Sequence, residues 1–149
     1  MSNSIAIGVA FLDQDIVGAN NVDANMVYAN MVYANQQLGY TNGAYGTVTQ
    51  SGNKASPVTL NNTAGTITTA NAQMAPGAEV AFVVTNSQVS ALDTVIVNIA
   101  SGATATFAYV IAVVTVSDGA FTINISNVSN NAYSNTLKIN FAILHIASA

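Results

Sequence analysis

The sequence predicts an all-β protein: an antiparallel β-sandwich, jelly-roll-like, with about eight strands and an N-terminal arm. Three observations support this class. Apolar and polar residues alternate with a period of two in much of the second half of the chain, as in strands with one face on a core. Turn-forming pairs of Gly, Pro, Asn and Asp separate these segments. In the stretch 94–117 the apolar residues are largely β-branched, which favours strands. An immunoglobulin-like arrangement is the alternative.

The chain divides near residue 45 into an N-terminal arm, residues 1–45, and a β-sandwich domain, residues 46–149. The arm contains a direct repeat, because residues 25–29 and 30–34 both read NMVYA. A period of five matches neither the helix period nor the strand period. A short helix over 22–38 and an extended arm are therefore both open, and two copies are too few for a solenoid.

Within the domain, each strand is expected from its own pattern. Asp118-Gly119 separates two alternating segments and is typical of a two-residue hairpin turn. Pro57 and Pro76 stand at expected strand starts, where proline is tolerated. The segments with clean alternation are 79–85, 95–99, 121–126 and 137–143, and further candidate strands are 5–12, 57–60, 65–70 and 106–117.

Charge is scarce in this chain. It has two Lys or Arg residues, six acids and one histidine, so that 5% of its residues are charged and its net charge is −4. An ordinary soluble domain has about 25% charged residues. Nucleic acids and anionic membranes are poor partners for such a chain, because both need clustered basic residues. The shortage of charge indicates that other copies or a partner cover much of the surface.

One stretch, residues 94–117, contains no charged residue at all. A membrane-spanning helix there is rejected, because the stretch contains Asn98, several threonines and a turn-like ASGAT centre. Two strands with a connection between them explain the pattern better.

No catalytic or metal-binding constellation is expected, so the chain is predicted not to be an enzyme and to need no cofactor. It has no cysteine, which excludes disulfides and thiolate zinc sites. Asp13 and Asp15 could begin a calcium site but lack the further acids that one needs, so a solvated turn or a polar partner contact is favoured. His145 is the only histidine, and a surface, interface or satisfied core position is favoured over catalysis. Glu79, Asp93 and Asp118 are expected to be structural acids at strand ends or turns.

Met and Tyr side chains in the arm are the predicted contacts with a partner. Tyrosine is favoured at interfaces because it buries a large ring and keeps a polar tip. Stacking of sugars by the same rings is the alternative. The predicted contact residues are Met26, Tyr28, Met31, Tyr33 and Tyr40.

Residues 47–149 resemble a family of small β-rich virion proteins of tailed bacteriophages and prophages. The segments that carry the resemblance are 47–51, 58–61, 65–68, 79–87, 93–102, 119–123, 127–129 and 137–143. Family members typically end in a segment of the INFAVIK kind, and residues 139–145 here read INFAILH. His145 stands where a lysine is usual, which puts a basic contact there in doubt.

The resemblance implies a structural virion protein. The composition and the resemblance together predict a capsid decoration, or cement, protein on the outer surface of the head, with the major capsid protein and its own copies as partners, as a homotrimer at three-fold positions. The alternative is a tail-fibre or spike module that binds a host receptor or glycan.

Overall fold

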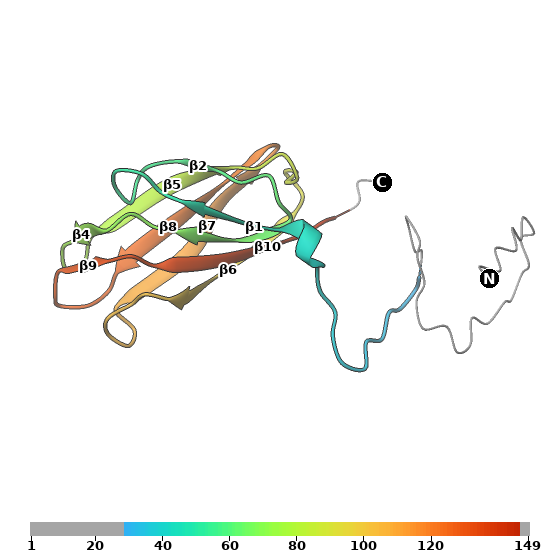
Figure 1. Ribbon diagram of the computed structural model, residues 1–149, viewed down its shortest axis with the longest axis horizontal. Helices are drawn as coiled ribbons and strands as arrows, with labels where there is room; N and C mark the ends of the chain where they lie inside the picture. Colours follow the sequence, from blue (N-terminus) through green and yellow to red (C-terminus); the bar gives the residue numbers. More distant parts are fainter. Residues whose placement is uncertain (1–28, 147–149) are drawn as a thin grey trace, which may run out of the picture. The chain divides into compact units, whose positions relative to one another are not determined.

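A computed structural model describes residues 29–146 of the chain (Figure 1). This part forms ten strands, one short 3-10 turn (η1, Asn42–Ala44) and no α-helix, which confirms the all-β prediction. The candidate strand 5–12, and the possible helix as far as residue 28, lie outside the described residues; residues 29–38 contain no helix. The strands are β1 (Tyr45–Thr49), β2 (Val58–Thr59), β3 (Ala64–Thr68), β4 (Ala72–Met74), β5 (Glu79–Thr85), β6 (Thr94–Ser101), β7 (Tyr109–Ser117), β8 (Ala120–Asn127), β9 (Tyr133–Asn135) and β10 (Lys138–Leu144).

The chain divides between Gln37 and Leu38 into two units, and every described strand belongs to the second. That unit contains two four-stranded sheets, in the orders β1-β3-β10-β6 and β2-β5-β8-β7 (Figure 1). A small third sheet pairs β4 with β9.

The expectation of purely antiparallel pairing is wrong at two places. Strand β1 runs parallel to β3, and β2 runs parallel to β5. Each of these pairs is separated along the chain by at least one strand of another sheet, and such a crossover brings two strands together in the same direction. The strand order does not show the expected jelly-roll arrangement.

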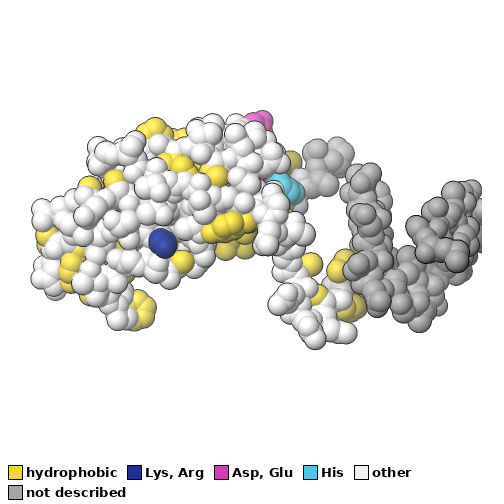
Figure 2. Space-filling model, viewed as in Figure 1, with side chains coloured by type: hydrophobic (Ala, Val, Ile, Leu, Met, Phe, Trp, Pro, Cys, Tyr) yellow, Lys and Arg dark blue, Asp and Glu magenta, His cyan; other side chains and the backbone are white. Residues whose placement is uncertain are grey.

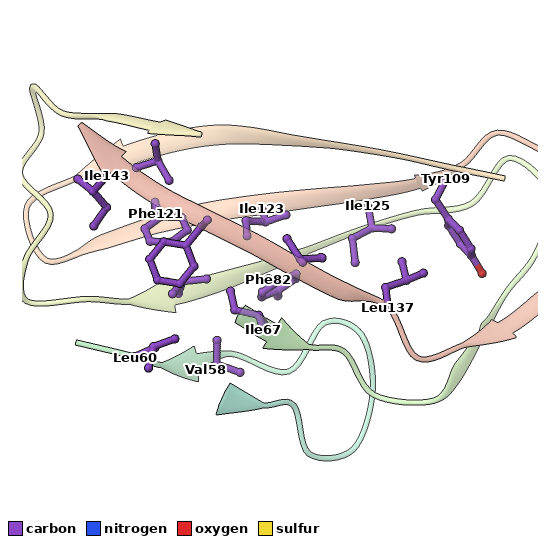
Figure 3. Close-up of a cluster of buried hydrophobic side chains, with 14 of the residues drawn as sticks. Val58, Leu60, Ile67, Phe82, Tyr109, Phe121, Ile123, Ile125, Leu137 and Ile143 are labelled. Carbon is purple, nitrogen blue, oxygen red and sulfur yellow. The ribbon is translucent and has the colours of Figure 1, made fainter. Parts of the chain in front are cut away.

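The predicted alternation is confirmed in the central strands. In β8, Phe121, Ile123 and Ile125 are buried while the residues between them are only partly covered. Strand β10 buries Ile139, Phe141 and Ile143 in the same way. Figure 3 shows core side chains of the two large sheets pointing toward one another.

The two large sheets pack face to face over one core. The rings of Phe121 in β8 and Phe141 in β10 lie 5.4 Å apart between centroids, with a tilt of 54°. Offset and tilted aromatic pairs of this kind stabilise a core beyond the area that they bury. The Asp118-Gly119 hairpin between β7 and β8 is confirmed, with Ser117 opposite Ala120.

The four sheet edges differ in length. Strands β1 and β2 form one pair of edges, and they have five and two residues. Strands β6 and β7 form the opposite pair, with eight and nine residues. Because β6 and β7 lie close together, the long edges of both sheets belong to one side of the sandwich.

Candidate interaction surfaces

The acidic side chains of the described part stabilise turns and strand ends. Asp118 accepts a hydrogen bond from the backbone N–H of Ala91 (2.8 Å), and Glu79 accepts one from the hydroxyl of Ser126 (3.2 Å). In residues 29–146, no three acids or histidines lie together as a metal site would require.

Asp93 contacts the histidine that the sequence had left without a neighbour. Its buried carboxylate accepts hydrogen bonds from the backbone N–H groups of Ser90 (2.8 Å) and Ile146 (3.0 Å), and lies 3.0 Å from Nδ1 of His145. The N–H of Ser90 is the largest cause that lowers the pKa of Asp93 from 3.8 to about 2, against the opposing effect of burial. The carboxylate therefore joins the loop before β6 to the end of β10. Hydrogen bonds from the side chains of His145 and Ser90 lower the same pKa further.

Lys54 is a buried cation that sequence reasoning missed. Its Nζ donates to the Thr69 hydroxyl (3.2 Å) and to the backbone oxygens of Ala70 (2.8 Å) and Asn135. No carboxylate of residues 29–146 pairs with it, and burial lowers the pKa of the amine from 10.5. The Asn135 side chain accepts from the hydroxyl of Tyr109 (2.9 Å) and donates to Thr104.

This polar cluster (Lys54, Thr69, Tyr109, Asn135 and Thr104) connects β9 to the loop 102–108 between β6 and β7. Every buried polar side-chain atom in the described part of the chain has a hydrogen-bond partner. The cluster therefore stabilises the fold and restrains the loop.

The predicted contact residues of the arm fall into three groups. Met26 and Tyr28 lie outside the described residues. Met31 and Tyr33 are 69% and 83% exposed, and the hydroxyl of Tyr33 donates to the sulfur of Met31 (3.1 Å). Tyr40 belongs instead to the sandwich unit, where its hydroxyl donates to the backbone oxygen of Ile143.

Tyr40 also lines an apolar hollow at the end of β10. The hollow has a volume of about 390 Å³ and is lined by Leu38, Gly39, Tyr40, Ala142 and Leu144. Nearby on the same outer sheet face, the hydroxyls of Tyr45 and Thr66 are hydrogen-bonded (2.7 Å), and Thr66 donates to Asn140 (2.5 Å). This face thus changes from apolar to polar along β10.

The uncharged stretch 94–117 forms the long-edged side of the sandwich. It comprises β6, the loop 102–108 and β7, so the expectation of two strands with a connection is confirmed. None of the helices of the described residues has the length and apolar character needed to cross a membrane. Figure 2 shows few charged side chains on the visible face of the described residues, among scattered hydrophobic groups.

Phe107, in this loop, combines exposure with backbone strain. It is 88% exposed, and it is the one described residue other than glycine with a positive φ, at 57°. This conformation costs a residue with a β-carbon about 1–2 kcal/mol, and leaving an aromatic ring in water adds no compensating stability. The residue lies beside a hollow of about 350 Å³ lined by Ile99 and residues 103–109. Nothing in the local pattern marked Phe107, because its exposure depends on where the two sheets end.

Comparisons with models of protein families, with curated proteins and with solved structures give no match to this chain.

Proposed function

We propose that this protein is a structural virion protein, a capsid decoration (cement) protein that binds the outside of a tailed-phage head as a homotrimer. The observation that carries the proposal is exposed apolar surface on an almost uncharged chain. Met31, Val32 and Tyr33 are largely exposed, and the side formed by residues 94–117 has no charge. Large exposed apolar patches on soluble proteins mark interaction sites.

The second support is the position of the ionisable groups. Asp93, Asp118 and Lys54 make their hydrogen bonds within the fold, to turns and strand ends. A role in assembly uses such a scaffold directly, because it needs complementary surfaces and no reacting group. The resemblance of residues 47–149 to tailed-phage virion proteins agrees with this role.

In this proposal, the arm attaches the protein to the major capsid protein. Each Met or Tyr side chain buried on a capsid subunit contributes about 25 cal/mol per Å² of apolar area. Repetition over many copies multiplies this contribution across the shell. The sandwich supplies contacts between copies, and these contacts would resist outward pressure on the head.

Antibody-gold labelling of intact virions tests the location. Gold over the whole head supports the cement function, and gold only at the tail refutes it. A binding assay with undecorated shells tests the arm: replacing both Met31 and Tyr33 by serine should weaken binding at least tenfold. Asn30→Ser is the matched control, because it changes an exposed residue of the same segment without removing apolar area.

A tail-fibre or spike module that binds a host glycan is the second candidate. The half-exposed Tyr45 ring beside the hydroxyl of Thr66 and the amide of Asn140 favours it, because sugars bind to an aromatic face with polar groups at its edge. Binding on a glycan array that is lost in Tyr45→Ala would select this candidate.

A further inference from the structure

The long-edged side of the sandwich carries unsatisfied backbone groups on two sheets at once. Among residues 29–146, strand β6 pairs only with β10, and β7 pairs only with β8. No strand of this part of the chain uses the outer N–H and C=O groups of β6 and β7, which can therefore pair with another strand. Proteins that remain monomeric protect such edges with short strands, lysine, proline or bulges.

The two sides of this sandwich treat their edges differently. On one side, β1 and β2 are short, which limits pairing. On the other side, β6 and β7 are long and contain neither a charged residue nor a proline. Register shifts interrupt the second half of β7, between Val113 and Thr115, and the end of β6, between Ile99 and Ser101. The long-edged side thus lacks the short strands that limit pairing on the other side.

An anchor and a hollow lie on the unprotected side. Phe107 is largely exposed to solvent, and the hollow of about 350 Å³ that it helps to line is large enough for a small ligand group. The loop is restrained on both sides of Phe107, since Asn135 binds Thr104 and the backbone oxygen of Ala108 accepts from the N–H of Val128 (3.0 Å). A restrained, exposed aromatic residue is typical of an interface hot spot.

We propose that this side faces the axis of a homotrimer, in which β6 of each copy lies against β7 of the next copy and the three Phe107 rings pack together. The occupant is a second copy of the chain because each copy offers two different free edges of similar length, side by side. A contact between two unlike edges is heterologous, and it closes into a ring when the rotation between copies allows. Because residues 94–117 carry no charge, no like-charge repulsion opposes the contact.

This inference rests on the proposed function, since it names the self-contact of the homotrimer. It also gives the uncharged stretch a role. In a trimer, the apolar groups of β6, the loop and β7 leave water together, and the short β1 and β2 edges remain outside, where they limit further growth.

Sedimentation equilibrium of the full chain tests the proposal. The wild type should be a trimer, and Phe107→Asn should raise its dissociation concentration by about thirtyfold or more, as loss of a hot-spot residue does. Asparagine accepts positive φ better than phenylalanine, so folding of the monomer should be retained. A wild type that stays monomeric at all working concentrations, or a trimer that Phe107→Asn leaves intact, overturns the proposal.

Two valines of the same sheet provide a matched pair. Val110 in the edge strand β7 and Val83 in the inner strand β5 are 54% and 42% exposed. Val110→Lys should raise the dissociation concentration about tenfold or more, whereas Val83→Lys should leave it within twofold. Equal effects of the two substitutions would contradict an interface at the edge.

Cross-linking tests which edges meet. The chain has no cysteine, so Ile96→Cys in β6 and Val114→Cys in β7 introduce single reactive thiols. A short thiol cross-linker should join the two variants when they are mixed, and should join neither to itself. Self-linking of either variant without mixed linking overturns the arrangement. A trimer that fails to bind shells would refute the cement function and leave this inference intact.

Discussion

Gly102 follows β6 directly, where the chain turns into the loop that carries Phe107, and it has a φ of +98°. A β-carbon on Gly102 would lie 2.0 Å from the backbone oxygen of Thr136 and 3.0 Å from Cα of Leu137. The backbone at 136–137 would have to move by more than 1 Å to reach ordinary van der Waals contact. This backbone leads into β10, and Leu137 is fully buried, so the movement would disturb the core.

The cost of Gly102→Ala has two parts. Positive φ costs alanine about 1–2 kcal/mol, and forcing extra volume into a packed site costs a further 1–3 kcal/mol, roughly. The expected loss of unfolding free energy is therefore about 2–5 kcal/mol. Gly119→Ala is the control, because Gly119 has a φ of +78° and no atom within 4 Å of the added carbon; it should lose only about 1–2 kcal/mol.

Urea unfolding followed by far-UV circular dichroism measures both variants. The titrations are made at several protein concentrations, because self-association adds apparent stability by mass action. If Gly102→Ala loses no more stability than Gly119→Ala, the close approach to Thr136 does not limit this position and the reasoning is refuted.

Three further predictions concern the core and the buried charges. Phe121→Ala should cost about 3–5 kcal/mol in urea unfolding, because it empties the centre of the core opposite Phe141; a loss below 1 kcal/mol would contradict the packing. Since the pKa of Lys54 is lowered by burial, the unfolded chain binds that proton more tightly. The wild type should therefore gain stability relative to Lys54→Met as pH rises through the lowered pKa toward 10.5, and a pH-independent difference would argue against a buried amine. The pKa of Asp93 is lowered to about 2, so its contribution should be complete above 3.8 and lost as pH falls through 2; acid titration of Asp93→Asn should lack this loss.

Side-chain alternation revealed the faces of the strands but not their partners. Phe121, Ile123 and Ile125 could be assigned to the core from the sequence because period-two alternation is local information. The pairing of β1 with β3 and of β2 with β5 depends on crossovers between sheets. The residues of a single strand do not indicate which strand it pairs with after such a crossover.

Short strands escaped detection for a related reason. β4 and β9 have three residues each, too few for an alternating pattern to be recognised. β2 was located only through the apolar pair around Val58 after Pro57. The short strands β2, β4 and β9 form because the longer strands next to them in the chain position their ends.

Exposed apolar residues were predictable only where composition marks them. The Met and Tyr residues of the arm were conspicuous as an apolar repeat, and Met31 and Tyr33 are exposed as a contact surface requires. Lys54 and Phe107 reverse the usual placement, with a cation buried and an aromatic ring exposed. Both placements follow from tertiary neighbours such as Asn135 and Thr104, which no local pattern reveals.

The position of β10 has a consequence for synthesis. It is the last described strand along the chain, yet it lies between β3 and β6 in its sheet. Until residues 138–144 have been synthesised, no strand lies between β3 and β6 to pair with both of them. The core beside these two strands is then incompletely covered. Folding must therefore wait for late translation, as expected for chains dominated by distant pairings. A nascent chain that stops before β10 cannot build this sheet, because β3 and β6 then lack the strand that joins them.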